Sequence, residues 1–189
     1  LGLRMSIDEV VPEGLDYNAG IEILKEFEAT GLIDFVNVIR GLVATDAQLS
    51  NVIPIHGMPA APHLDFAGLV KENTGLAVLH ASKIDDVATA RYAIQEGKVD
   101  LVGMTRAHMA DPHIVLKVIE EREEQIRPCV GATFCLDGIY ENGEALCVHN
   151  AATGREAIMP HKVLPAEKHR KIIVIGAGPA GLEAARVAG

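Results

Sequence analysis

The sequence has no tryptophan, only three cysteines among its 189 residues, and no apolar run close to the roughly 18 residues that a membrane-spanning helix needs. Its first residues also lack the basic segment followed by an apolar segment that marks a secretory signal. Basic side chains are in deficit, because 17 Lys and Arg stand against 26 Asp and Glu and leave a net charge of −9. We therefore expect no membrane partner, no export and no sequence-independent binding of nucleic acid.

The cysteines are odd in number, and no export signal accompanies them. This combination predicts free thiols in a reducing, cytoplasmic compartment rather than a disulfide framework. All three lie between residues 129 and 147, so they need an explanation as a group.

Short apolar segments alternate with longer segments of helical period, which predicts βα units and a parallel sheet. The expected strands span residues 1–7, 32–39, 76–80 and 99–104, and the expected helices span 18–30, 85–96 and 114–124, with another around 66–70. The strands start about 31, 44 and 23 residues apart, close to the roughly 30-residue repeat of an eight-fold barrel. The α/β fold is therefore either the C-terminal half of a TIM (β/α)8 barrel or an open doubly wound sheet.

The chain changes character after Arg127. Residues 128–165 hold the cysteines and almost no periodicity, so we expect an irregular connector that needs an external organiser. Residues 166–189 begin a new unit, with an expected strand over 171–175, a glycine turn and the start of a helix. We predict a half barrel over 1–127, a cysteine-containing connector over 128–165, and the truncated start of a Rossmann-like dinucleotide-binding domain over 166–189.

A glycine fingerprint follows the last expected strand. Gly176 permits a tight turn, Gly178 allows the backbone to approach a pyrophosphate, and Gly181 lets the helix pack against its strand. The acidic residue that binds the ribose, expected about 20 residues further on, would lie beyond Gly189. The motif predicts a site for FAD, ADP or NAD(P)H of which only the first part is present.

Three thiols of the connector, Cys129, Cys135 and Cys147, are candidate metal ligands. An iron–sulfur cubane takes four thiolates, and Ala132 stands where a C-x-x-C ligand would fall. Three cysteines are compatible with a three-iron cluster, with a zinc site that has His149 as fourth ligand, or with buried thiols that bind no metal.

Polar residues gather where the expected strands end. In a barrel, chemistry takes place on the loops that follow the C-terminal ends of the strands. Two consecutive strands end in small or cationic residues that suit a phosphate cradle of backbone N–H groups and a guanidinium. The strand-end residues are Arg4, Asn37, Arg40, His80, Ala81, Ser82, Lys83, Thr105 and Arg106.

With strand-end arginines, a cysteine cluster and a dinucleotide fingerprint in this order, the chain resembles the two-domain flavoproteins of the old yellow enzyme superfamily. That branch includes trimethylamine dehydrogenase, histamine dehydrogenase and dienoyl-CoA reductase, and it belongs to the NADH:flavin oxidoreductase family. The resemblance runs through the whole chain. It rests on RMSIDEVVPEGL, VDLVGMTRAHMADPH, RPCVGATFC with CVHNAATGRE, and KIIVIGAGPAGLEAARVAG.

The resemblance implies FMN across the C-terminal mouth of the barrel. Arg4 would contact the N1/O2 edge of the isoalloxazine, Ala81, Ser82 and Lys83 would give backbone donors to the FMN phosphate, and Arg106, after Thr105, would pair with that phosphate. The family usually has glycine where Ser82 stands and arginine where Lys83 stands.

The family's cluster ligands fall on Cys129, Cys135 and Cys147, with Ala132 at the fourth position, so the resemblance leaves an iron–sulfur cluster in doubt. The family's acid–base residues come from barrel strands that this sequence does not contain. The sequence thus resembles an internal segment of a longer enzyme, which we call the parent protein.

We expect the parent protein to be an FMN-dependent oxidoreductase. Its small-molecule substrate would be an N-methylated amine or an activated alkene, and the segment NAATGRE favours the amine branch. The alternative is a non-catalytic α/β module that binds a phosphate-bearing ligand or self-associates. Because half a barrel exposes two sheet edges, we also expect a homo-oligomer.

Overall fold

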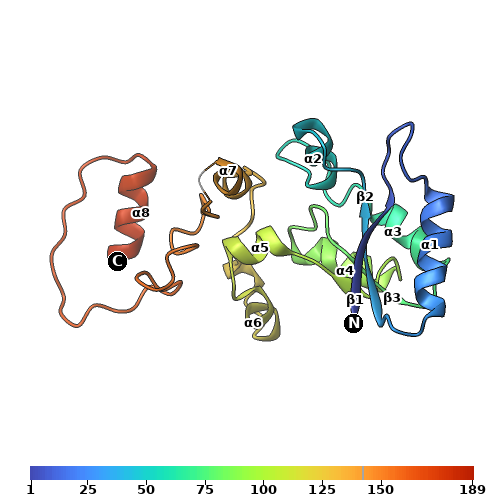
Figure 1. Ribbon diagram of the computed structural model, residues 1–189. Coiled ribbons are helices and arrows are strands. Elements are labelled where there is room, and N and C mark those ends of the chain that lie inside the picture. Colours follow the sequence, from blue (N-terminus) through green and yellow to red (C-terminus); the bar gives the residue numbers. More distant parts are fainter. Residues whose placement is uncertain (142) are drawn as a thin grey trace.

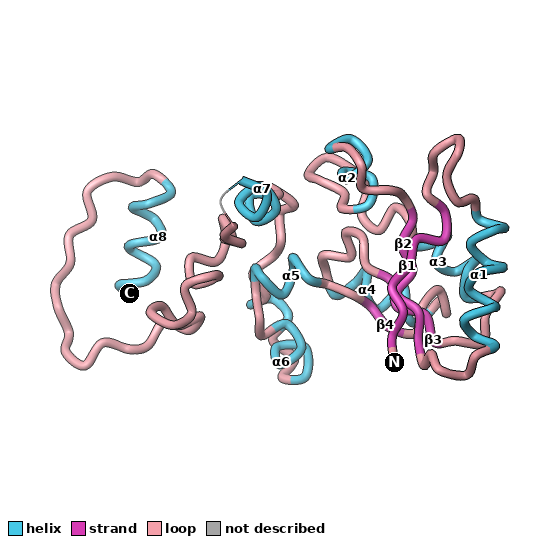
Figure 2. Tube along the Cα trace, viewed as in Figure 1, coloured by secondary structure: helices cyan, strands magenta, loops and turns pink. Residues whose placement is uncertain are grey.

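The computed structural model describes residues 1–141 and 143–189. Within these residues, four parallel strands form one sheet in the order β1-β2-β3-β4, with helices between them (Figures 1 and 2). The strands are β1 (Gly2–Asp8), β2 (Phe35–Arg40), β3 (Ala77–His80) and β4 (Leu101–Val102). The helices are α1 (Tyr17–Ala29), α2 (Asp46–Val52), α3 (Leu64–Lys71), α4 (Val87–Gln95), α5 (Thr105–Ala110), α6 (Ile114–Ile119), α7 (Phe134–Glu141) and α8 (Pro179–Ala188), with a short 3₁₀ helix η1 (Glu123–Gln125). The prediction of an α/β fold with a parallel sheet is confirmed.

The two faces of the sheet differ in chemistry. Val36, Val38 and Val78 are at most 1% exposed and pack toward the helices. Arg4 and Asn37 are paired in register on β1 and β2, and they alternate with these buried positions. Because successive side chains in a strand point to opposite faces, Arg4 and Asn37 lie on the other face.

Helix α1 packs against β1 at very short range. Asp16 caps the helix by accepting a hydrogen bond from the N–H of Ala19, which explains where it begins. Gly20 faces the strand, and a Cβ atom at that position would lie 2.0 Å from the carbonyl oxygen of Ile7. Only glycine therefore allows this contact, which lets Ile21 and Leu24 enter the core.

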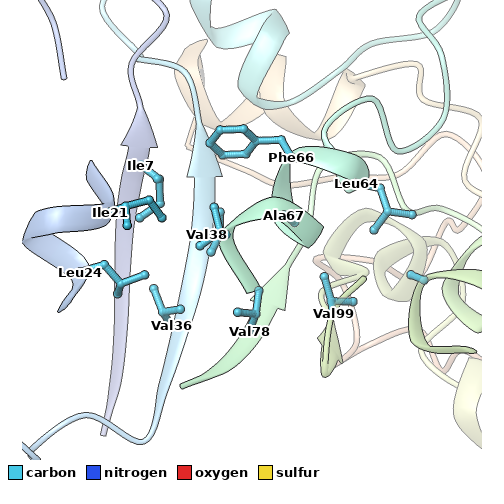
Figure 3. Close-up of a cluster of buried hydrophobic side chains, with 12 residues drawn as sticks. Ile7, Ile21, Leu24, Val36, Val38, Leu64, Phe66, Ala67, Val78 and Val99 are labelled. Atoms are coloured by element: carbon cyan, nitrogen blue, oxygen red, sulfur yellow. The ribbon is translucent and has the colours of Figure 1, made fainter. Parts of the chain in front are cut away.

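One hydrophobic core lies between the sheet and the helices (Figure 3). It is made of Ile7, Ile21, Leu24, Val36, Val38, Leu64, Phe66, Ala67, Val70, Val78, Ala93 and Val99. Each fully buried Val, Leu, Ile or Phe side chain stabilises the fold by about 1.5–3 kcal/mol. The core residues come from β1, β2, β3, α1, α3, α4 and the start of the β4 segment, so this packing joins the four βα units.

His80, the last residue of β3, is an imidazole buried at the edge of this core, with 1% exposure. Its Nδ1 lies 2.9 Å from the carbonyl oxygen of Val38 and must donate, because a carbonyl only accepts. Nε2 is therefore the unprotonated nitrogen, and it is buried without a partner among the described residues. Burial lowers the pKa of His80 from 6.5 to about 4, although the Val38 hydrogen bond acts in the opposite direction.

Three helices occur where no helix was expected. They are α2 in the loop after β2, α5 directly after β4, and α7 inside the connector. All have eight residues or fewer, which is too short for a hydrophobic period to stand out from the flanking loops. No helix in the described part of the chain is long and apolar enough to cross a bilayer.

Two predicted elements were wrong. Residues 171–175 form no strand, and Ile173 and Ile175 are 79% and 95% exposed. A parallel strand needs a neighbour for its backbone hydrogen bonds, and the described residues supply none there. The helix expected over 114–124 ends at Ile119, because Glu121 adopts a left-handed conformation with φ of 54°. The N–H of Arg122 then bonds the carbonyl of Lys117, and this arrangement ends the helix.

The buried His80 predicts a pH dependence of folding. Because its folded pKa of about 4 lies below the ordinary 6.5, the unfolded chain binds one more proton between these values. Stability is then full above pH 6.5 and falls as the pH drops toward 4, by up to about 3 kcal/mol. Urea unfolding at a series of pH values should show this slope. The slope should shrink in His80→Gln and persist in a control, His169→Gln, which changes an exposed histidine. Parallel slopes in all three proteins would contradict a neutral, buried His80.

Candidate functional site

The carboxyl ends of the strands open at one edge of the sheet, where a pocket with about 260 Å³ of empty space lies. We call it the strand-end pocket. Its lining residues are Arg4, Asn37, Val38, Ile39, Arg40, Val52, His63, His80, Ala81 and Ser82. The structure thus brings together six of the predicted strand-end residues, from the ends of three strands. They are Arg4, Asn37, Arg40, His80, Ala81 and Ser82.

The loop after β3 has an unusual backbone. Ser82 and Lys83 both have positive φ, at 95° and 55°. Such angles are costly for residues with a Cβ, which gives a physical reason for a glycine at the position of Ser82. The hydroxyl of Ser82 is buried without a partner among the described residues. The Lys83 side chain does not line the strand-end pocket. Its Nζ instead donates to the carbonyl oxygens of Ile55, at 2.9 Å, and Met58.

Arg106 lies in the first turn of α5, beside the loop after β3. Its Nη2 donates to the carbonyl oxygen of Pro54 at 2.9 Å, while Nη1 is buried and has no partner among the described residues. Burial raises the pKa of Asp85, with Asp86 adding to the effect, and the charges of Lys83 and Arg106 oppose it. Arg106 is thus electrostatically coupled to this loop, although it lines a different pocket. Thr105 is exposed at the start of the same helix.

A larger hollow, with about 540 Å³ of empty space, opens beside the strand-end pocket. We call it the loop pocket, because it lies between the loops after β1 and β2. Its lining residues are Glu9, Val10, Arg40, Gly41, Leu42, Gln48, Asn51 and His63. The two pockets share Arg40 and His63.

His63 was not singled out from the sequence, because it stands in a loop without a paired ligand. Its Nε2 donates to the carbonyl of Asn51 at 2.8 Å, which makes Nδ1 the acceptor nitrogen in the neutral tautomer. That Nδ1 is buried without a partner among the described residues, as is Nε2 of His80. Both imidazoles therefore place a hydrogen-bond acceptor at the strand-end pocket.

The three cysteines line one pocket with about 340 Å³ of empty space, which we call the cysteine pocket. Arg106, Ala132 and His149 also line it. All three thiols are free and half-buried, and burial raises the pKa of Cys135, which disfavours its thiolate. Among the described residues, no three Cys, His, Asp or Glu side chains are arranged to hold a metal ion.

Polar contacts hold the connector against α5. Asn150 donates through Nδ2 to the carbonyl of Met109 at 2.9 Å, and the Thr153 hydroxyl donates to the same carbonyl at 2.7 Å. Both residues are buried. This segment, whose sequence is NAATGRE, is thus a docking element of the connector.

Asp111 anchors the chain between α5 and the connector. Its carboxylate accepts hydrogen bonds from Lys117 and from the backbone N–H groups of His113 and Arg127. Burial alone raises the pKa of Asp111, but these hydrogen bonds outweigh burial and hold it below its usual value.

The glycine fingerprint forms its turn without the expected strand. Gly176 has φ of 111°, and α8 begins directly after Gly178. A Cβ on Gly181 would lie 1.9 Å from the carbonyl oxygen of Gly176, so glycine is required there for the helix to pack against the turn. The turn and the helix start match the predicted motif.

No family model matches the chain, but known proteins are similar to it along its whole length. It is 61% identical, over its full length, to the probable N-methylproline demethylase of Rhizobium meliloti, of which it covers 28%. It is 43% identical over its full length to an N,N-dimethylglycine/sarcosine dehydrogenase of Chromohalobacter salexigens, covering 27%, and 44% identical over 99% of its length to a multifunctional alkene reductase/demethylase OYE of Caballeronia cordobensis, also covering 27%.

A solved structure shows that the similarity extends to the fold. A 2-naphthoyl-CoA reductase complex superposes with a TM-score of 0.86 at 27% identity, covering 98% of this chain and 28% of that one. The chain thus spans between a quarter and a third of the length of these four proteins. Because the similarity covers almost every residue of the chain, it includes the strand-end pocket, the cysteine pocket and the glycine turn together. Along its whole length the chain is thus similar to a segment of N-methyl demethylases, dehydrogenases and reductases of the old yellow enzyme type.

Proposed function

We propose that residues 1–127 form the C-terminal half of a (β/α)8 barrel in an FMN-dependent oxidoreductase that demethylates an N-methylated amino acid. The observation that carries the substrate class is the 61% identity to a probable N-methylproline demethylase over all 189 residues. An alkene substrate is less well supported, because the relative named for alkene reduction is 44% identical, below the 61% of the demethylase, and is itself also named a demethylase.

The half barrel is supported by three features of the sheet. Its strands are parallel and follow chain order, as in a barrel and without the reversal of a doubly wound sheet. Helices cover one face, and Arg4 is exposed on the other. We keep the boundaries 1–127, 128–165 and 166–189 for the half barrel, the connector and the start of the nucleotide domain. The exposed edges β1 and β4 support self-association.

The residues at the strand ends fit FMN. Buried polar atoms normally have hydrogen-bond partners, yet Ser82 Oγ and Arg106 Nη1 have none among the described residues. Ser82 and Arg106 line different pockets, and a phosphate bound between the loop after β3 and the start of α5 would supply both partners. Gly103 permits close approach of the neighbouring loop, since a Cβ there would lie 2.9 Å from that of Ala81.

The residues of this chain take separate roles around that cofactor. Arg4, an exposed cation, would stabilise negative charge on the isoalloxazine. The backbone of Ala81, Ser82 and Lys83, with Thr105 and Arg106, would hold the phosphate. Bound FMN would supply the two-electron acceptor for a C–H bond of the N-methyl group, and water would hydrolyse the resulting iminium to formaldehyde and the demethylated amine.

The glycine turn supports a second nucleotide, FAD, ADP or NAD(P)H. Gly176, Gly178 and Gly181 leave the backbone bare at the start of α8, where the helix begins with unpaired N–H groups. The ten-residue length of α8 is enough for such a site.

A four-iron cluster does not fit the cysteine pocket. Ala132 offers no ligand where a fourth thiolate would stand, and burial disfavours the thiolate of Cys135. We therefore propose that Cys129, Cys135 and Cys147 are thiols that line the interface between connector and half barrel.

The parent protein should oxidise N-methyl-L-proline. Under anaerobic conditions we expect the amine to bleach the flavin absorbance, with one formaldehyde released per flavin reduced, because the hydride acceptor and the methyl group react in equal amounts. For comparison, 2-cyclohexenone, an activated alkene, is added to the reduced protein and the reoxidation of its flavin is measured. Rapid reoxidation by the alkene, without any reduction by N-methyl-L-proline, would contradict demethylation.

Arg106→Ala should weaken FMN binding. Loss of a charge-assisted hydrogen bond to phosphate predicts a Kd about 10- to 100-fold higher, measured by flavin fluorescence after dilution. Arg91→Ala is the matched control, because Arg91 is exposed and pairs with Glu123 on the helical side. Equal flavin retention in both variants would remove Arg106 from the phosphate site.

The iron content of the purified parent protein should fall below one cubane per chain. Iron and acid-labile sulfide are measured together, and Ala132→Cys serves as the comparison because it restores a fourth thiol. Four irons per chain with Ala132 in place would show that another residue supplies the missing ligand.

A further inference from the structure

The loop pocket contains a cation whose position is fixed from two sides. Nε of Arg40 lies 3.1 Å from Oδ2 of Asp8, and the guanidinium carbon lies 4.9 Å from the centre of the Phe66 ring. Asp8 is itself held, because its Oδ1 accepts a hydrogen bond from the N–H of Val10 at 2.9 Å. The side chain of Arg40 is therefore oriented before any ligand binds.

The terminal amino groups of Arg40 are available to a ligand. Within the described residues, the hydrogen bond of its guanidinium passes through Nε, and its side chain remains 38% exposed. A guanidinium offers a planar fork of donors that matches the two oxygens of a carboxylate. Arg40 therefore has the chemistry and the orientation for binding a carboxylate in two contacts.

Other groups of the pocket have complementary chemistry. Gln48 accepts a hydrogen bond from the N–H of Ala44 through its side-chain oxygen, which leaves its amide NH₂ as a donor. Glu9 accepts from the N–H of Leu15 through Oε2, which leaves Oε1. The pocket thus offers a cation, a neutral donor and an anion, a set that matches an amino-acid zwitterion better than a simple amine.

The backbone of the pocket wall is strained. Val10 has φ of 57°, a conformation that is rare for a β-branched residue, and its side chain is 59% exposed. Strain of this kind persists only where surrounding contacts enforce it, and it is concentrated at binding sites. Here the contact between Val10 N–H and Asp8 enforces it, so one carboxylate both shapes the wall and orients Arg40.

We propose that the loop pocket binds the carboxylate of an N-methylated α-amino acid and that Arg40 determines specificity for amino acids over amines that lack a carboxylate. Gln48 assists Arg40, Glu9 faces the nitrogen end of the substrate, and Asp8 is a positioning residue. The proposal rests on the demethylation proposed above. Because Arg40 and His63 line both pockets, a substrate held by its carboxylate in the loop pocket adjoins the strand-end pocket assigned to flavin.

The test compares two amines that differ by the carboxylate, N-methyl-L-proline and N-methylpyrrolidine, on the flavin-loaded parent protein. The measured quantity is the ratio of kcat/KM for the first amine to that for the second. In Arg40→Met we expect this ratio to fall about 10- to 100-fold, as for loss of a hydrogen-bonded charge. In Arg40→Lys, which keeps the charge but not the fork, we expect a smaller fall. Arg91→Met, which changes an exposed arginine outside both pockets, should keep the ratio of the unmodified protein.

A binding measurement separates failure of this proposal from failure of the proposed reaction. Isothermal titration of the loaded protein with N-methyl-L-proline should show binding that weakens in Arg40→Met by a similar factor. If the unmodified protein binds N-methyl-L-proline through Arg40 but does not oxidise it, the demethylation is wrong and the carboxylate site stands. If binding and the ratio are the same in Arg40→Met and the unmodified protein, the carboxylate site is overturned.

Asp8→Asn tests the positioning role. It keeps the size of the side chain but weakens the contact to Arg40, so KM for N-methyl-L-proline should rise while kcat changes little. The flavin content and the thermal midpoint of each variant establish that it is folded. A fall in kcat without a rise in KM would overturn the positioning role of Asp8.

Discussion

Parallel pairing of strands in chain order is the constraint on which the rest of this structure depends. It sends the carboxyl ends of β1, β2 and β3 to one edge of the sheet, and it requires that helices return along one face. The apolar side chains fill the space between that face and the helices. Polar groups and strained backbone of the sheet region therefore gather at this edge and in its loops, where the strand-end pocket and the loop pocket lie.

This separation shows in the buried polar atoms. Among the described residues, four buried side-chain nitrogen or oxygen atoms have no partner: His63 Nδ1, His80 Nε2, Ser82 Oγ and Arg106 Nη1. Each such atom costs about 1–3 kcal/mol, and all four belong to the last residue of a strand or to the segment that follows a strand. Burial of the apolar core thus offsets the free-energy cost of these unpaired atoms. A ligand with both donors and acceptors would recover much of that free energy.

The sequence was a good guide to the large elements and to part of the site. The order of βα units and the meeting of Arg4 with Ala81 and Ser82 follow from topology, because residues at parallel strand ends share an edge. The exact contacts of Lys83 and Arg106 do not follow from topology. They depend on the loop after β2, whose carbonyls at Pro54, Ile55 and Met58 capture these side chains, and no hydrophobic period encodes such contacts.

The connector illustrates a different limit of sequence patterns. Its irregular composition predicted an external organiser, and a metal cluster was one candidate. In the structure, polar contacts organise the connector. Asn150 and Thr153 donate hydrogen bonds to a single carbonyl of α5, and the Asp111 carboxylate accepts one from the N–H of Arg127. These partners lie between 16 and 44 residues apart, so the pairing depends on the fold and not on local spacing.

Backbone strain follows the same division between core and edge. Six non-glycine residues of the described chain have positive φ, and four of them, Val10, Ala61, Ser82 and Lys83, lie in the loops after β1, β2 and β3. Strained residues cost about 1–3 kcal/mol each, so they persist only where contacts over-determine them. Asp8 supplies such a contact at Val10, and the backbone bond between Ala61 and Lys83 links two of the strained positions directly. The rigid sheet therefore holds three separate loops in conformations that none would keep alone, and this enforced geometry is what a binding site at the edge requires.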